Sequence, residues 1–380
     1  MARVLDLTRQ AAVYATRLLA EQGHEVIRVE APAGDAVRRL GPFLGGVPDL
    51  EDGAYHQFFN AGKRSLALDV ATVEGREVFA RLVPSAEVIV ASAPLPLDEA
   101  AIRALNPGVV LTVVTGDEQP ELCAYARAGL LAITGHPGQA PVLMGGHVIY
   151  AATGAWVMVG IAAAMLVRKL TGQGQTVAVD IQQCFEIFLD HAVETYTARG
   201  RLTERRGHRG AVTPISGAFP AADGYWMLSL GDATERWLTF MDWMQDPVLA
   251  GDAALRDYDE RLARRDVILE RIGAWTARFP KAEIVAEAQR RHFPCAPVAT
   301  ALELADDEQL VARGFLVEVD HPAHGRMRFP RGALATLWDR DVALAPRLGA
   351  ANHEILSELG YSPDEQGMLF ERGVTGASLR

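Results

Sequence analysis

One long apolar segment constrains the fold of this chain more than any other feature. Residues Val148 to Val167 contain no charged side chain, and a helix of this length can cross a lipid bilayer. A helix that is apolar on all sides also occurs in the core of a large soluble protein. The segment is rich in alanine and glycine, and apolar strands are expected on both sides of it, at Val109–Val114 and Thr176–Asp180. We therefore predict a buried helix of a soluble α/β protein rather than a membrane span.

Before this helix, short apolar strands alternate with helices. The residues Val4–Thr8 are typical of a buried strand, Ala11–Glu21 of a helix and Glu25–Glu30 of a second strand. Two strands joined by a helix form a right-handed unit of a parallel sheet. The pattern therefore predicts a Rossmann-like α/β layer with helices on both faces. Further helices are expected at Glu74–Arg81, Glu99–Leu105, Tyr150–Leu170 and Ile181–Ala198, and a further strand at Glu87–Val90.

The character of the sequence changes after a polar, basic and glycine-rich stretch at residues 200–210, which indicates a linker. A strand with aromatic side chains is expected at Gly224–Leu230. Amphipathic helices follow it, which predicts a smaller α+β domain. The tail, residues 340–380, is expected to be polar loop apart from one short helix. The helices expected in this half are Arg236–Met244, Leu262–Phe279, Lys281–Gln289 and Asn352–Leu359, with another strand near Phe315–Val319.

The bulk composition excludes several classes of partner. A net charge of -11 and a pI near 5.4 are unsuited to nonspecific binding of nucleic acid or of an anionic membrane surface. Cys123, Cys184 and Cys295 are too few and too far apart for a disulfide framework or a metal site. The sequence starts with an expected strand rather than with a signal peptide. These features predict a cytoplasmic protein with no metal, nucleic-acid or membrane partner.

Short sequence phrases along nearly the whole chain resemble those of one family. The apolar helix ends in the turn Thr171-Gly-Gln-Gly-Gln175, and a strand follows it to Val179. Together with phrases elsewhere, this segment resembles the family III CoA-transferases (CaiB/BaiF), which include formyl-CoA transferase, the carnitine CoA-transferases and α-methylacyl-CoA racemase. The other phrases are Val4–Thr8, Leu18–Asp35, Phe59–Asp69, Leu105–Pro107, Phe219–Tyr225, Pro294–Val298 and Leu348–Tyr361.

The resemblance implies an architecture and a chemistry. Residues 1–200 and 321–380 are expected to build one large Rossmann-like domain, and residues 201–320 the linker and a small α+β domain. Two such chains are expected to form an interlocked-ring dimer. The implied reaction moves CoA between carboxylic acids. A coenzyme A thioester is then a substrate, and no cofactor is bound covalently.

The nucleophilic Asp of the family is missing from its expected position. In the family it lies ten or eleven residues before the glycine that corresponds to Gly160, and these positions hold Tyr150 and Ile149 here. Transfer of CoA between carboxylic acids needs a carboxylate that attacks the thioester and forms a mixed anhydride. A phenol with a pKa of about 10 is a poor replacement. The resemblance therefore predicts a member of the family with an altered catalytic site.

The positions where the family binds coenzyme A also differ in this chain. After the strand Glu87–Val90, family members have a Glu-Asn-Phe-x-Pro-Gly phrase and an arginine, whereas residues 91–100 here contain no basic side chain. Phosphate groups bind to cationic side chains or to helix N-terminal amides. The phrase around Tyr125 likewise lacks the Asp of many relatives. Gln10 and Leu68 are the remaining candidates for coenzyme binding.

Charged side chains elsewhere have both a functional and a structural interpretation. Glu186, Asp190 and Glu194 recur every four residues and are expected on one helix face, where they are candidate replacements for the missing carboxylate. We favour a solvated face, with the apolar residues 185 and 187–189 buried. The basic run 201–209 is a candidate contact for a CoA phosphate or an acidic partner, and a solvated linker is preferred.

Tyr150, at the expected position of the missing nucleophile, and His147, three residues before it, also have both a functional and a structural interpretation. Tyr150 either acts as a catalytic acid or fills the vacated pocket with its ring, and pocket filling is the preferred interpretation. His147 is a candidate base, although a single histidine is more often structural.

These observations lead to three functional hypotheses. The first is a noncatalytic subunit of a heteromeric CoA-transferase, which forms an interlocked heterodimer or heterotetramer with a homologous chain that retains the Asp. Such an enzyme would move CoA from succinyl-CoA, for example, to an aryl- or alkylsuccinate. The second is a self-sufficient enzyme similar to an acyl-CoA racemase or hydrolase, which uses His147, Tyr150 or the face of Glu186 and Asp190. The third is a nonenzymatic scaffold on the same fold.

Overall fold

The computed structural model describes residues 1–208, 215–332 and 341–376, and the chain divides into two compact units. Unit 1 comprises residues 1–130, 144–194 and 309–380, so both ends of the chain contribute to it. Unit 2 comprises residues 131–143 and 195–308. Residues 131–143, which the sequence places in the large domain, therefore group with unit 2. The end of the expected linker at 200–210 lies outside the described residues.

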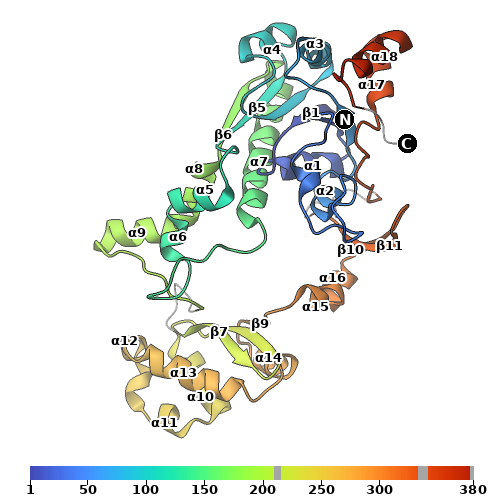
Figure 1. The fold of residues 1–380 in the computed structure, drawn as a ribbon. Helices are drawn as coiled ribbons and strands as arrows, with labels where there is room; N and C mark the ends of the chain where they lie inside the picture. The colour runs from blue at the N-terminus through green and yellow to red at the C-terminus, as the bar shows by residue number, and fades with distance from the viewer. Residues whose placement is uncertain (209–214, 333–340, 377–380) are drawn as a thin grey trace. The chain divides into compact units, whose positions relative to one another are not determined.

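Unit 1 is built on a six-stranded sheet in which every strand pairing is parallel. The strand order β3-β2-β1-β4-β5-β6 reverses its direction between β1 and β4, as in Rossmann folds (Figure 1). The predicted α/β class with a parallel sheet is therefore confirmed. The strands are β1 (Arg3–Leu7), β2 (Glu25–Glu30), β3 (Arg64–Ala67), β4 (Val88–Ser92), β5 (Val110–Thr115) and β6 (Thr176–Asp180).

The main core of unit 1 lies between this sheet and helices from both ends of the chain. Leu5 and Ile27 of the sheet belong to one buried cluster with Phe79 of α3, Ile355 of α17 and Leu369 of α18. The helices of unit 1 are α1 (Val13–Glu21), α2 (Ala54–Phe59), α3 (Val73–Leu82), α4 (Glu99–Leu105), α5 (Glu121–Arg127), α7 (Val148–Thr171), α8 (Ile181–Glu186), α17 (Asn352–Glu358) and α18 (Pro363–Glu371).

Helix α18 corrects the expectation that the tail after α17 is polar loop. A capping box starts this helix, because the Ser362 amide donates to Glu365 Oε2 at 2.7 Å and the Glu365 amide donates back to Ser362 Oγ at 3.4 Å. Pro363 at the first helical position strengthens this local signal. The buried Leu369 then anchors α18 in the core.

The long apolar segment forms α7, a single helix that is partly buried in unit 1. Two glycines let it approach its neighbours closely. A Cβ atom at Gly154 would lie 2.8 Å from Tyr14 Cβ in α1, and one at Gly160 would lie 2.7 Å from Val177 Cγ1 in β6. Only 39% of the most apolar 18-residue stretch of this helix is buried, so α7 is a core helix on one side only. Large apolar side chains on its other side are exposed, namely Val148, Trp156, Val159, Leu166, Val167 and Leu170.

The helix expected at Ile181–Ala198 is interrupted. Helix α8 ends at Glu186, residues Ile187–Leu189 form a 3-10 turn, and α9 (Asp190–Arg199) follows. Phe185 is buried as expected, but Ile187 and Phe188 are about half exposed. The expectation that residues 187 and 188 are buried is therefore wrong, because no element of this chain covers them in the described residues.

Unit 2 has an antiparallel sheet in the order β7-β8-β9 and a core rich in aromatic rings. Trp226 of β8 packs in this core with Phe240 of α10 and Trp275 of α13. The helix expected at Leu262–Phe279 is divided into α12 and α13. The elements are β7 (Ser216–Ala221), β8 (Gly224–Ser229), β9 (Cys295–Pro297), α6 (Leu130–Ile133), α10 (Thr234–Met244), α11 (Pro247–Ala250), α12 (Tyr258–Ala263), α13 (Arg265–Thr276), α14 (Lys281–Arg290) and α15 (Ala301–Ala305).

Unit 1 also contains a hairpin near the end of the chain. The strand expected near Phe315–Val319 is β10 (Leu316–His321), and it pairs with the antiparallel β11 (Gly325–Pro330). The short α16 (Glu308–Ala312) precedes it.

The close approach of α7 to α1 makes a stability prediction. We expect Gly154→Ala to lower the free energy of unfolding by about 1–3 kcal/mol, because the added methyl group overlaps Tyr14 and the Ala15 amide. The matched control is Gly367→Ala in α18, where no atom lies within 4 Å of an added Cβ. That change is expected to be neutral or to stabilise by up to about 1 kcal/mol. Urea denaturation checks both variants, and equal effects would contradict the proposed packing constraint.

Candidate functional site

The strand order of unit 1 places a candidate ligand site at the carboxyl ends of β1, β4 and β5, where doubly wound sheets bind ligands. Three segments are joined there by hydrogen bonds. The Arg9 amide donates to Ser92 Oγ at 2.9 Å, and Ser92 Oγ donates to Asp117 Oδ2 at 2.7 Å. Burial raises the pKa of Asp117 above its usual value. A carboxyl group thus lies at the point of the sheet where a phosphate would be expected.

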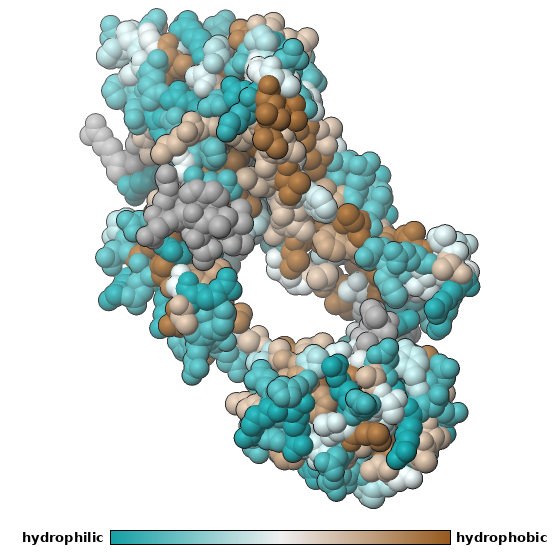
Figure 2. Space-filling model, turned by 180° about the vertical axis from the view of Figure 1, so that it is seen from behind, coloured by the Kyte–Doolittle hydropathy of each residue, from teal (hydrophilic) through white to brown (hydrophobic). Residues whose placement is uncertain are grey.

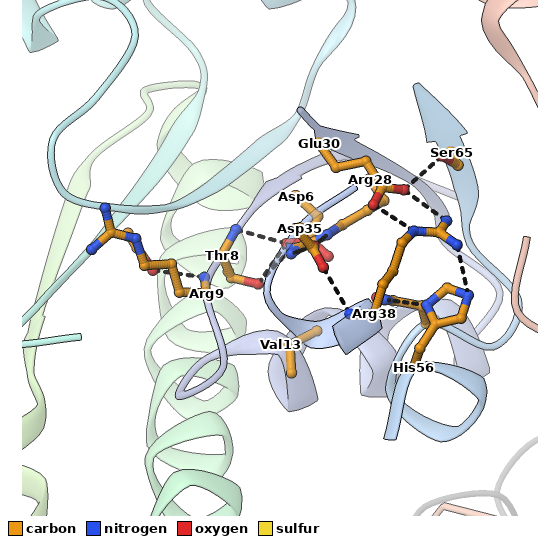
Figure 3. Close-up of polar contacts among 12 residues, drawn as sticks. Asp6, Thr8, Arg9, Val13, Arg28, Glu30, Asp35, Arg38, His56 and Ser65 are labelled. Atoms are coloured by element: carbon orange, nitrogen blue, oxygen red, sulfur yellow. Dashed lines mark hydrogen bonds and ion pairs between the residues drawn. The ribbon is translucent and has the colours of Figure 1, made fainter. Parts of the chain in front are cut away.

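Next to this point, a network of buried charges fills the carboxyl ends of β1 and β2 (Figure 3). Asp6 has no exposed surface, and its two oxygens accept from Arg28 Nη1 and from Lys63 Nζ, both at 2.8 Å. Burial alone would raise the pKa of Asp6, but the two cations outweigh it and lower that pKa. Burial lowers the pKa of Lys63 to about 8, against the opposing effect of Asp6.

The same network continues through Arg38. Its Nε donates to Glu30 Oε2 at 2.7 Å, its Nη1 contacts Glu51 at 3.0 Å, and the same nitrogen lies 3.1 Å from His56 Nε2. Arg28 pairs in addition with Asp35. Arg28, Arg38 and Lys63 are therefore each bound to carboxylates of their own chain. These carboxylates neutralise the positive charge of the three side chains.

Tyr150, which the sequence resemblance predicts to replace the family nucleophile, lies at the start of α7 in unit 1. Tyr150 is 5% exposed, and its ring is parallel to that of His147 with the centroids 6.0 Å apart. Burial, and to a smaller extent the carboxylate of Glu121, raise the pKa of Tyr150. His147 Nδ1 lies 2.6 Å from Glu121 Oε2, and Tyr55 meets the His147 ring edge-on at 5.5 Å. The phenol at this position is therefore protonated and unsuited to nucleophilic attack.

The structure brings together some of the sequence-predicted site residues and separates others. Gln10 lies near Tyr55 and lowers the pKa of its hydroxyl against the larger effect of burial, so it lies beside the group of His147 and Tyr150. Leu68 follows the edge strand β3, is 1% exposed, and belongs to the hydrophobic core. Three carboxylates, of Glu186, Asp190 and Glu194, are exposed along α8 and α9.

Sequence reasoning missed Tyr55, Asp117 and Glu121. The Glu121–His147 contact joins residues 26 positions apart, so no local pattern indicates it. The only local signal is that Glu121 opens a short helix after Pro120. Within the described ranges, no group of three or more His, Cys, Asp or Glu side chains is placed to hold a metal ion.

Comparison with known proteins identifies the class. Residues 2–352 match the model of CoA-transferase family III. The succinyl-CoA:mesaconate CoA-transferase of Haloarcula hispanica is 32% identical, over 94% of this chain and 95% of that protein. The succinyl-CoA:(R)-benzylsuccinate CoA-transferase subunit BbsE of Thauera aromatica is 29% identical, over 99% and 97%. The crystal structure of a CAIB/BAIF family protein from Brucella suis matches with a TM-score of 0.79 and 26% identity, over 94% of this chain and 98% of that one.

This chain belongs to CoA-transferase family III. The family resemblance predicted from the sequence is thereby confirmed. The family moves CoA between carboxylic acids, and acyl-CoA thioesters are its substrates.

The buried network makes a prediction about stability. We expect Asp6→Asn to lower the free energy of unfolding by about 3–5 kcal/mol, because Arg28 and Lys63 remain buried without their shared carboxylate. The matched control is Glu318→Gln, which removes a carboxylate from an exposed pair with Arg326 and should cost at most about 1 kcal/mol. Similar losses in denaturant titrations of the two variants would contradict the role assigned to Asp6.

His56 makes a prediction about pH. Burial, and then Arg38, lower its pKa to about 3, whereas the unfolded residue takes up a proton near pH 6.5. The unfolded state therefore binds more protons below pH 6.5, and stability falls there by about 1.4 kcal/mol per pH unit from this residue alone. We expect His56→Gln to flatten the stability profile between pH 6 and 4.5. An unchanged slope in the variant would show that His56 does not titrate in this way.

Proposed function

We propose that this chain is the noncatalytic subunit of a heteromeric family III CoA-transferase. The observation that carries the proposal is the burial of the Tyr150 phenol, which the sequence resemblance places at the position of the family's nucleophilic carboxylate. A mixed anhydride requires a carboxylate as nucleophile, and a phenol whose pKa is raised further by burial stays protonated at neutral pH. A homologous partner chain that retains the Asp would then carry out the transfer.

The charges at the carboxyl ends of the strands support this role. Arg28, Arg38 and Lys63 are paired with carboxylates, and Asp117 adds a further acidic group beside Ser92. Paired cations attract phosphate groups weakly, since the attraction is offset by the adjacent carboxylates. We therefore expect little affinity of this chain alone for coenzyme A.

The exposed apolar face of unit 1 supports association with a second chain. Figure 2 shows a band of hydrophobic residues on this face, and the exposed residues of α7 together with Ile187 and Phe188 supply large apolar side chains. Apolar surface of this kind marks an interaction site. A homologous subunit in an interlocked heterodimer or heterotetramer is the proposed occupant, in the cytoplasm.

The similarity to a named subunit supports a substrate class. BbsE belongs to an enzyme that acts on succinyl-CoA and (R)-benzylsuccinate, and it matches this chain almost end to end. We propose succinyl-CoA as the donor and an aryl- or alkylsuccinate as the acceptor.

The proposal is tested by isolating the protein from its native host and identifying every chain that co-purifies. We expect a homologous chain with an Asp at the position of Tyr150, CoA transfer by the complex, and no transfer by this chain alone. Leu166→Lys, on the exposed side of α7, should prevent assembly. The control is Leu302→Lys in unit 2, which changes a side chain that is 79% exposed and should not prevent assembly. Transfer by this chain alone, or a complete lack of a homologous partner, would refute the proposal.

A further inference from the structure

Glu121 and His147 form a carboxylate–imidazole pair at the start of α7. Glu121 Oε2 lies 2.6 Å from His147 Nδ1. A carboxylate accepts hydrogen bonds and does not donate them, so this contact suits the ring tautomer whose N–H is at Nδ1. In the neutral ring Nε2 is then unprotonated and can accept a proton.

The imidazole of this pair is more accessible than the carboxylate. The Glu121 side chain is 10% exposed, whereas that of His147 is 43% exposed. Glu121 Oε1 is buried without a hydrogen-bond partner among the described residues. The charge of the carboxylate therefore acts mainly on the imidazole. This is the arrangement in which a carboxylate stabilises an imidazolium that forms during a reaction.

The surroundings hold the imidazole in place. Its ring is stacked on Tyr150 with an angle of 5° between the planes, and Tyr55 packs against its edge. The backbone of His147 is left-handed, with φ of 47°, although the residue is not glycine. Such a conformation is unfavourable by about 1–3 kcal/mol and is kept only where the surrounding structure fixes it.

We propose that Glu121 and His147 form a general-base site that hydrolyses acyl thioesters, with water in the place of an acceptor carboxylic acid. His147 Nε2 takes a proton from water while the water oxygen attacks the thioester carbonyl carbon. The tetrahedral intermediate collapses with cleavage of the C–S bond. The imidazolium returns its proton to the leaving thiolate, so the products are a carboxylic acid and a free thiol.

The two residues have different roles in this reaction. His147 is the catalytic residue, because it exchanges protons with water and with the leaving group. Glu121 is a positioning residue that fixes the ring tautomer and stabilises its charged form. The activity goes beyond the proposed function, in which this chain is noncatalytic for CoA transfer only, because attack by water needs no nucleophilic carboxylate in this chain.

Two thioester probes test this activity on the purified full-length chain. Succinyl-CoA tests the physiological class of thioester, and S-succinyl-N-acetylcysteamine tests a thioester without a nucleotide. Thiol release is followed with a thiol-reactive chromogen. We expect release above the spontaneous rate from at least one probe. Release no faster than the spontaneous rate from both probes would overturn the inference.

Variants separate proton transfer from a structural role. We expect His147→Ala to lower kcat about 100-fold or more, and imidazole in the buffer to restore part of the loss. Glu121→Gln keeps the size of the side chain and should lower kcat with little change in KM. The matched control is His353→Ala, an exposed imidazole on α17, which should keep the full rate.

The outcomes of this test are distinct from those of the proposed function. Hydrolysis by His147→Ala at the wild-type rate, with unchanged circular dichroism, would overturn the general-base site. Lack of rescue by imidazole would do the same. Neither outcome bears on CoA transfer by a complex with a homologous partner, which is measured with an acceptor acid present.

Discussion

Asp6 at the end of β1 is bound by both Arg28 and Lys63, and the rest of unit 1 depends on this contact. The three side chains come from β1, β2 and the segment before β3, so their pairing fixes the order of strands on one side of the sheet. Removing one partner of a buried pair leaves an uncompensated charge, which makes such a network strongly interdependent. Because Arg28 and Lys63 are paired in this network, the same contact that stabilises the sheet limits the attraction of these two cations for phosphate groups.

Helix α7 connects this scaffold to the proposed partner and to the site. Gly154 and Gly160 let it lie against α1 and β6, and its start carries His147 and Tyr150. Its opposite side exposes Val159 and large apolar neighbours. A helix with one buried and one exposed apolar side has the composition of a membrane span, although its core side is packed against the α/β sheet. The proposed homologous partner accounts for the exposed side.

The proposed site at the start of α7 lacks a nucleophilic carboxylate and contains an imidazole instead. We propose that the phenol of Tyr150 stands in place of the carboxylate that CoA transfer requires, and its ring is stacked on the imidazole of His147. Glu121 supplies a carboxylate that is 10% exposed and lies close enough to orient that imidazole. The proposed site thus keeps the family scaffold and has a base where the family has a nucleophile.

The sequence by itself determined the strands β1 and β2, the long helix and the membership of the family. These features depend on local periodicity or on residues at fixed spacing, so they can be recognised without a structure. The sequence did not indicate the break between α8 and α9 at Ile187–Leu189. A run of apolar residues looks the same whether its own chain or another chain covers it. The tertiary structure alone decided that Glu121 meets His147 and that Leu68 lies in the core. Contacts between distant residues arise from how the elements pack, and no short stretch of sequence specifies that packing.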